Sequence, residues 1–270
     1  MSKYRNKFCQ SSSPGKGPSA DQIWNASQKV GTPAYKYARA ICEKVLNIHD
    51  LAEIDERIYM AAPKSKDSIN RKARNNYNGD RTRIKDGARL TLFTKSADET
   101  EKIIKTFTGG YMQNKFIKDM QRRSDYRFHE EPKDFISNPK RWGYMATYLV
   151  LEHKQTTFEI QIYPECMKPV YDITHKLYDS VRGSLEKWEQ SGKNIDNVLS
   201  KDELNILQEM LDLHKNAAKE AGILKLVNRF PKLGDLPSLV REFNITPYPQ
   251  DEERPAPNHS VNIHAPAYDS

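Results

Sequence analysis

Apolar and polar positions alternate most regularly in residues 143–167, where two strand-like runs flank His153-Lys154-Gln155. This period of two predicts a β-hairpin with one packed face and one polar face. The second run places Glu159 and Gln161 together on the polar face. A carboxylate and an amide on a rigid strand could hold a metal ion and a substrate, although the solvent side of an edge strand carries the same pattern.

Two further strands are predicted upstream of the hairpin. One lies within Ile54–Ala62, and the other begins at Asp86 and runs through residue 94, with apolar and polar residues alternating. Lys115–Met120 is expected to form a short strand. Residues 122–142 are expected to form an extended basic loop that leads into the hairpin.

Helical periodicity accounts for much of the remaining chain. Two helices are expected in residues 20–47, with a break near Gly31-Thr32-Pro33, and others over 68–76, 96–107, 167–188 and 200–219. Ser65 or Asp67 is the expected cap of helix 68–76, Ser96 caps the next, and Ser200 with Glu203 forms a capping box. The expected buried stripe of helix 167–188 consists of Val170, Ile173, Thr174, Leu177 and Val181.

These elements predict one α/β (α+β) domain with a mixed sheet of about five strands, helices on its faces and extra helices at both ends. Its expected extent is residues 20–225. Residues 1–19 read as a disordered Ser/Gly/Pro-rich segment. Residues 226–270 read as a C-terminal extension that is Pro-rich from about 246.

Composition narrows the possible partners and compartments. A net charge of +7 favours anionic partners such as nucleotides or RNA. No apolar run approaches a membrane span, so no membrane partner is expected. Three widely spaced cysteines and the lack of an apolar leader favour the cytoplasm, and export by another route, as for an effector, stays open.

A cluster of basic residues surrounds the predicted start of helix 68–76. Its members are Lys64, Lys66, Arg71, Lys72 and Arg74. A helix N-terminus also offers free backbone N–H groups, so this segment could bind phosphate. In isolation, a solvated basic face explains the same charges.

Three segments in this order, KSKDSINRK, DGARL and GY…FEIQI, together resemble the synthetase domain of the RelA/SpoT family, which makes the alarmone nucleotides ppGpp and pppGpp. The resemblance covers about residues 50–185. It implies a nucleotidyltransferase-like synthetase fold. It also implies transfer of the β,γ-pyrophosphate of ATP to the 3′-hydroxyl of a guanine or adenine nucleotide, with Mg²⁺ as cofactor.

Roles for individual residues follow from the resemblance. For ATP, it implies contacts by Lys64, Ser68, Arg71, Lys72 and Arg89. For the metal and the reaction, it implies Asp86 and Glu159 as Mg²⁺ ligands, with Glu159 also able to help deprotonate the hydroxyl and Gln161 supporting it. For the acceptor, it implies stacking on Tyr144 and contacts by Lys133, Lys140, Arg141 and Tyr148.

Each residue has a structural explanation beside its functional one. Asp86 could simply begin a strand, and Tyr144 could pack across strands. The chain also departs from the family pattern at Ala62, where many members have Arg, and at Tyr148, where members often have His. Both departures affect the choice of acceptor and leave room for an inactive relative.

Three functions therefore remain open from sequence. The first is a stand-alone nucleotide pyrophosphokinase, because the chain lacks the upstream His-Asp cluster of the family's hydrolase half. The second is the same chemistry on the 3′ end of tRNA, as a toxin or effector. The third is a degenerate, non-catalytic relative that binds nucleotide, RNA or a protein. The sequence does not specify the oligomeric state.

Overall fold

The computed structural model describes residues 17–123, 126–191 and 193–233. Most of the segment expected to be disordered, and the Pro-rich tail, lie outside these residues. In the part of the chain that is described, no helix is both long and apolar enough to cross a membrane.

A mixed sheet of six strands forms the centre of the molecule, and helices flank it, which confirms the predicted α/β (α+β) class. The strand order is β1-β2-β6-β5-β3, and β4 also pairs with β5. Strand β2 runs parallel to β6, and the other pairs are antiparallel. The strands are β1 (Ile58–Met60), β2 (Arg89–Thr94), β3 (Tyr126–Phe128), β4 (Lys133–Asp134), β5 (Thr147–His153) and β6 (Thr156–Pro164).

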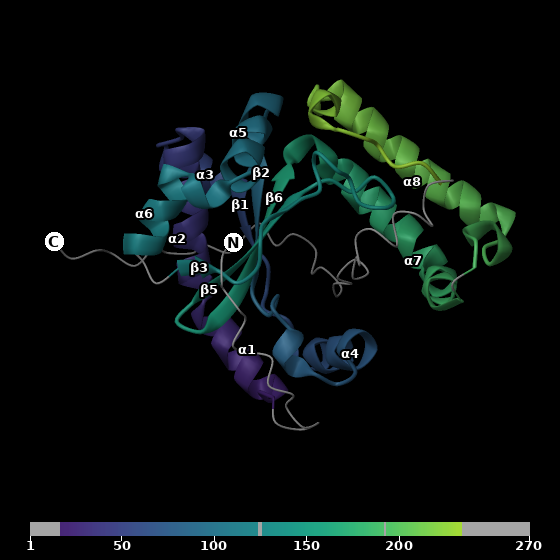
Figure 1. The fold of residues 1–270 in the computed structure, drawn as a ribbon, viewed down its shortest axis with the longest axis horizontal. Helices are drawn as coiled ribbons and strands as arrows, with labels where there is room; N and C mark the ends of the chain where they lie inside the picture. Colours follow the sequence, from purple (N-terminus) through teal and green to yellow (C-terminus); the bar gives the residue numbers. More distant parts are fainter. Residues whose placement is uncertain (1–16, 124–125, 192, 234–270) are drawn as a thin grey trace, which may run out of the picture.

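Eight α-helices lie in the described ranges. They are α1 (Ala20–Lys29), α2 (Gly31–Ile41), α3 (Leu51–Arg57), α4 (Lys66–Tyr77), α5 (Ala97–Phe107), α6 (Lys115–Arg123), α7 (Lys168–Ser191) and α8 (Lys201–Glu220). Figure 1 shows α2, α3 and α6 on one side of the sheet and α7 and α8 on the other, with α1 and α4 together at one end.

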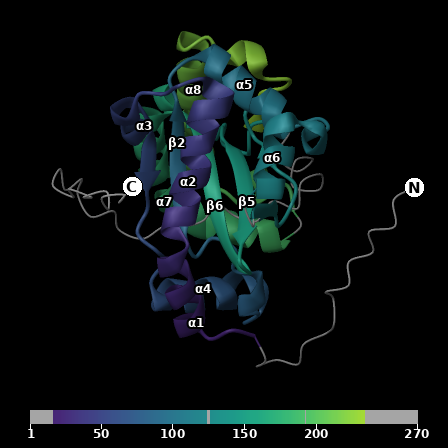
Figure 2. The same ribbon diagram turned by 90° about the vertical axis from the view of Figure 1, so that its left-hand side faces the viewer.

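The main core lies between the sheet and helices α2, α3, α5 and α6. Alternate residues of β2 and β6, among them Leu90 and Ile160, are fully buried there against Ile41 and Phe107. Figure 2 looks onto this side, with α2 crossing in front of β2 and β6. Because side chains alternate along a strand, the residues between these core positions point to the opposite face.

The β5–β6 hairpin has the predicted position and turn. Register pairs run from Thr147↔Ile162 to His153↔Thr156. Lys154 and Gln155 connect the strands, with φ angles of 48° and 65°. Positive φ at both central residues is the geometry of a type I′ turn, which matches the twist of a two-residue hairpin.

Helix starts largely follow the predicted caps. Ser65 accepts a hydrogen bond from the Ser68 backbone N–H and begins α4, Ser96 begins α5 in the same way, and Ser200 forms a capping box with Glu203. The predicted break near Gly31 is also present, between α1 and α2.

Two predicted strands are wrong in whole or in part. Lys115–Met120 belongs to helix α6, where the Asn114 side chain accepts from the Phe116 N–H. Within Ile54–Ala62, the first residues belong to α3, because Asp50 caps that helix and the strand begins only at Ile58. Both predictions relied on the strand propensity of a few neighbouring residues. Helix capping and tertiary packing outweigh such a local preference.

Three smaller corrections concern boundaries and burial. Asp86 precedes its strand rather than opening it, since β2 begins at Arg89. The expected loop 122–142 contains the short strands β3 and β4, which raise the strand number to six. On α7, Ile173 is 48% exposed and not part of the buried stripe, whereas Thr174, Tyr178 and Val181 are buried.

Candidate active site

The face of the sheet opposite the main core carries the predicted charged residues. Arg89 on β2 is the register partner of Glu159 on β6, and Thr91 is the partner of Gln161. The Gln161 amide Nε2 donates a 2.6 Å hydrogen bond to Glu159 Oε1. The amide therefore fixes the orientation of a carboxylate that is only 8% exposed.

Backbone hydrogen bonds hold Asp86 beside this face. The Glu159 N–H donates to the Ala88 carbonyl at 3.0 Å, and the Lys64 N–H donates to the Gly87 carbonyl at 3.0 Å. A Cβ at Gly87 would lie 2.3 Å from Ser27 Oγ, so a side chain here would force Ser27 on α1 to move. The residue before this glycine, Asp86, is 3% exposed.

Two lysines contact the Asp86 carboxylate. Lys72 Nζ lies 2.6 Å and Lys64 Nζ 3.5 Å from Asp86 Oδ2. Lys72 reaches it from the second turn of α4, on the same helix face as buried Ser68 four residues earlier. Arg71 is exposed, and its Nη2 donates to Ser68 Oγ at 3.4 Å. The structure thus brings Lys64 and Lys72 to Asp86, with Ser68 one turn before Lys72 on α4.

The pKa values of Asp86 and Glu159 are shifted in opposite directions. Burial by itself would raise the pKa of Asp86, but the positive charges of Lys64 and Lys72 outweigh burial and lower it well below the usual range. Burial raises the pKa of Glu159, and the negative charge of Asp86 raises it further. Asp86 therefore stays ionised, whereas Glu159 binds a proton more readily, and the two carboxylates lie within electrostatic reach of each other.

The donor set fits a hard divalent cation. Asp86 Oδ1 is buried and has no hydrogen-bond partner among the described residues. A second carboxylate, Glu159, lies in electrostatic range. The described ranges hold no group of three or more His, Cys, Asp or Glu side chains that could bind a metal. Such a sparse oxygen set suits Mg²⁺, which keeps several waters and takes further ligands from substrate phosphates.

Lys140 lies against aromatic rings at the other end of this face. Its Nζ lies 4.4 Å from the ring centroid of Phe135, 4.5 Å from that of Tyr148 and 5.5 Å from that of Tyr144. Burial lowers the pKa of Lys140 to about 8, against the opposing effect of the Glu159 charge. Lys140 is therefore a cation held by ring faces within electrostatic reach of Glu159.

Tyr144 and Tyr148 belong to a packed cluster of tyrosines. Both are 5% exposed, and the Tyr148 hydroxyl donates to the Tyr144 hydroxyl at 3.1 Å. The Tyr144 ring also lies 5.6 Å from that of Tyr163 and 6.0 Å from that of Tyr171. In this arrangement Tyr144 offers little surface to a base, and its stacking role stays a prediction.

The structure separates the other two basic residues predicted for the acceptor. Lys133 is exposed, and its Nζ lies 2.9 Å from Glu130 Oε1. Arg141 is 5% exposed, and its guanidinium lies over the rings of Trp142 and Trp188, at 5.7 and 5.8 Å from the centroids. Arg141 therefore packs against α7, and its predicted contact with phosphate is not supported by exposure.

Sequence reasoning missed two neighbours of the site. Glu130 joins Lys85 and Lys133, at 2.9 Å from each ammonium. Phe135 lies under Lys140. The three-residue spacing of Glu130 and Lys133 was the one available signal, whereas nothing in the sequence indicates which ring a lysine will meet.

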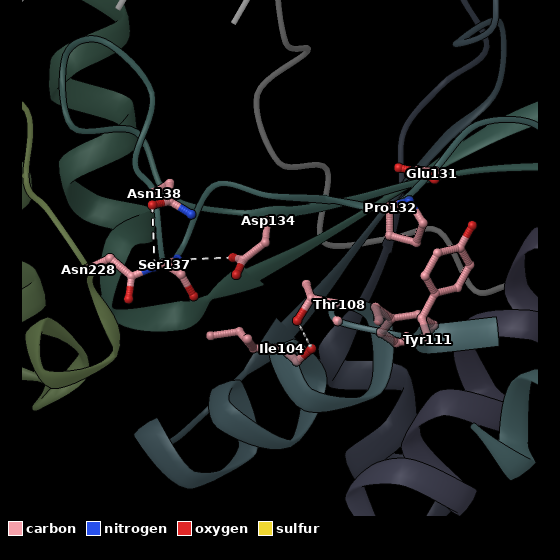
Figure 3. A pocket seen from close by; sticks show the side chains of 12 residues that line it. Ile104, Thr108, Tyr111, Glu131, Pro132, Asp134, Ser137, Asn138 and Asn228 are labelled. Carbon is pink, nitrogen blue, oxygen red and sulfur yellow. Dashed lines mark hydrogen bonds between the residues drawn. The ribbon is translucent and has the colours of Figure 1, made fainter. Parts of the chain in front are cut away.

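A pocket of about 540 Å³ lies elsewhere, between the end of α5 and the segment around β4. Figure 3 shows Thr108, Tyr111, Glu131 and Asp134 around it, with Asn228 from the C-terminal segment. None of the residues predicted for catalysis or for binding ATP or the acceptor lines this pocket. It is therefore separate from the charged face described above.

Comparison with known proteins finds likeness in solved structures only. No family model and no curated protein matches the sequence. A GTP pyrophosphokinase family protein from Streptococcus pneumoniae matches at 16% identity with a TM-score of 0.47, covering 76% of this chain and 88% of that one.

Two further structures match at 18% identity with a TM-score of 0.44. Small alarmone synthetase 1 from Bacillus subtilis, bound to its product pppGpp, covers 75% of this chain and 93% of its own. The Type VI effector Tas1, in complex with its immunity protein, covers 74% and 96%. All three matches are distant in sequence and moderate in structural overlap.

Proposed function

We propose that this protein transfers the β,γ-pyrophosphate of ATP to a hydroxyl group of a nucleotide acceptor. One observation carries the proposal: two buried carboxylates of different basicity, Asp86 and Glu159, lie within electrostatic reach of each other beside Lys64, Lys72 and Arg89. Pyrophosphoryl transfer needs alignment and charge neutralisation more than covalent help, and this arrangement provides both.

On the donor side, the start of α4 would hold the polyphosphate. Lys64 and Lys72 would contact its oxygens, with Ser68 and Arg71 beside them on the same helix. The free N–H groups and positive dipole end of the helix add to this charge. Exposed Arg71 would close over the phosphates from the solvent side.

On the acceptor side, Glu159 would take the proton from the attacking hydroxyl. Its pKa is raised by burial and by Asp86, which makes it a better base than an ordinary carboxylate near neutral pH. Gln161 holds Glu159 Oε1 in place with a 2.6 Å hydrogen bond. Lys140, within electrostatic reach of Glu159, would stabilise charge on the acceptor.

Asp86 and Glu159 would hold Mg²⁺, and the orphaned Asp86 Oδ1 supports this assignment. When bound, the ion supplies neutralisation of the phosphate charge that builds up during transfer.

The test is an acceptor screen. Purified protein is incubated with ATP, Mg²⁺ and each of GDP, GTP, GMP, ADP and ATP, and AMP release is measured. We expect AMP with at least one acceptor and none with Asp86→Asn. Nucleotide binding by calorimetry without AMP from any acceptor would instead support the degenerate, non-catalytic alternative.

A second acceptor class, RNA, is favoured by exposed basic residues around α4. Arg71 and Arg74 are exposed, and exposed Arg83 stacks over Tyr77 with its guanidinium carbon 4.7 Å from the ring centroid. Cations combined with an aromatic face suit a nucleic-acid backbone and its bases. Transfer of labelled phosphate to tRNA, with gel shifts at increasing salt, tests this alternative.

A further inference from the structure

A lysine side chain already contacts Asp86, the proposed metal ligand. The Lys72 ammonium lies 2.6 Å from Asp86 Oδ2, closer than Lys64 at 3.5 Å. The positive charge of Lys72 also lowers the pKa of Glu159, so Lys72 lies in electrostatic range of both carboxylates. Lys72 thus places positive charge beside the two carboxylates that would hold a divalent ion.

We propose that Lys72 takes the place of the metal ion in the ligand-free protein, and that it moves from Asp86 to the nucleotide polyphosphate when metal and nucleotide bind together. The inference rests on the proposed nucleotide site. It adds a positioning role for Lys72 and an order of events: this site binds the metal–nucleotide complex, and it binds the free ion poorly.

The contacts explain why the free ion should bind poorly. Asp86 Oδ2 accepts a 2.6 Å hydrogen bond from the Lys72 ammonium. A metal ion that binds this oxygen would have to displace that ammonium, which lowers its affinity. A divalent ion entering alone would also face the charges of Lys64 and Arg89, both of which act on Asp86. Two carboxylates are too few to replace the hydration of Mg²⁺, and the described residues offer no third acidic, His or Cys ligand.

A polyphosphate removes each of these obstacles. Its oxygens complete the metal coordination, and they also accept hydrogen bonds from Lys72 once it leaves Asp86. The Lys72 side chain is flexible and 17% exposed, so its ammonium can turn toward the start of α4 without movement of the helix. Metal and nucleotide should therefore raise each other's affinity by the same factor.

The alternative is that Lys72 is a permanent structural partner of Asp86. In that case the metal would use Oδ1 alone, and removal of the ammonium would not help the free ion. The two possibilities predict opposite effects of Lys72 on metal affinity.

The experiment measures Mn²⁺ binding, as a spectroscopic substitute for Mg²⁺, by electron paramagnetic resonance. It compares the full-length wild type with Lys72→Met, each with and without the non-hydrolysable analogue AMPCPP. For the wild type, we expect AMPCPP to raise Mn²⁺ affinity at least about tenfold. For Lys72→Met, we expect free Mn²⁺ to bind about tenfold more tightly than to the wild type, and the effect of AMPCPP to shrink.

Two controls separate the effect of the Lys72–Asp86 contact from the effect of removing a positive charge near Asp86. Lys85→Met removes the same charge next to Asp86, but Lys85 pairs with Glu130, so free Mn²⁺ affinity should change less than about twofold. Asp86→Asn should abolish Mn²⁺ binding in every condition. Should Lys72→Met unfold, the comparison of the wild type with and without AMPCPP, together with Lys72→Gln, takes its place.

Equal affinity of the wild type for Mn²⁺ with and without AMPCPP would overturn the proposal. So would unchanged free Mn²⁺ affinity in folded Lys72→Met or Lys72→Gln. The acceptor screen tests the proposed function independently of this inference. If Mn²⁺ binds as expected but no AMP forms, the pyrophosphokinase activity is wrong and the movement of Lys72 stands. If AMP forms but Lys72 has no effect on Mn²⁺ affinity, the activity stands and the movement of Lys72 is wrong.

Discussion

The two ends of one sheet face use the same strand alternation for different purposes. At one end, Asp86 and Glu159 lie with lysines in a buried set of charges. At the other, Tyr148 and Tyr163 pack into an aromatic cluster, and Lys140 lies over the Tyr148 ring. Strand alternation places Glu159, Tyr148 and Tyr163 on this face, whereas Asp86 and Lys140 reach it from the segments before β2 and β5, and Lys72 from α4.

The difference lies in how each end is stabilised. In the charged end, stability depends on pairing, because an unpaired buried charge is costly. In the aromatic end, it depends on area and ring contacts, which tolerate loss of single polar atoms better. Substitutions at each end, and the pH dependence of Lys140, should therefore affect activity and stability differently.

The largest effect is expected from Glu159→Gln. The change keeps the shape of the side chain but removes the proposed base and a metal ligand, so turnover should fall by about 10³-fold. AMP release under saturating ATP measures it. Glu152→Gln is the matched control, because Glu152 lies on the same hairpin but pairs with Arg127. Retention of more than a tenth of wild-type turnover by Glu159→Gln would contradict the assigned role.

Asp86→Ala should have the largest effect on stability. It leaves the ammonium groups of buried Lys64 and partly buried Lys72 without their shared carboxylate. We expect the free energy of unfolding in urea to fall by about 3 kcal/mol. An unchanged urea midpoint would mean that the lysines find other partners at no cost, and that the charged end is not held by pairing.

Lys140 gives the aromatic end a dependence on pH. Its pKa is about 8 in the folded protein, below the usual 10.5 of lysine. Between pH 8 and 10.5 the unfolded chain binds more protons, so stability should rise with pH in this window. We expect a gain of roughly 2 kcal/mol in urea unfolding between pH 7.5 and 10, after allowance for partial exposure.

Lys140→Met is the control for that gain, because it removes the titrating group and keeps an apolar side chain against the rings. Its stability should not show the rise. A rise of equal size in this variant would assign the pH dependence to another group.

Tyr148→Phe should have the smallest effect. It removes the hydroxyl that donates to Tyr144 at 3.1 Å but leaves the ring beside Lys140. We expect a loss of about 1 kcal/mol in urea unfolding, well below that of Asp86→Ala. Equal losses in the two variants would remove the contrast between the two ends.

Local patterns predicted the elements that they determine directly. Alternation placed the hairpin, and Ser65, Ser96 and Ser200 marked helix starts, because a cap is made by residues within one turn. Lys115–Met120 failed as a strand, since its helix is set by the Asn114 side chain and by packing against the core.

For the site, the ordered motifs brought forward Asp86, in the segment before β2, and Glu159, on the polar face of β6. The sequence could not predict that Lys72 makes a shorter contact with Asp86 than Lys64 does. It also could not predict that Arg141 turns away to the tryptophans. Such contacts depend on helices distant in sequence, and no local period encodes them.

The turn at Gly143 connects the C-terminal helices to this chemistry. Its φ is +81°, and a Cβ there would lie 2.8 Å from the Cβ of His214 on α8 and 2.9 Å from Cζ of Phe230. The segment that carries Lys140 and Tyr144 therefore packs, at Gly143, against His214 of α8 and against Phe230. Grafting the sheet and α4 alone onto another scaffold would transplant the acids without the support for their neighbouring cation, so a minimal engineered version should extend at least through Phe230.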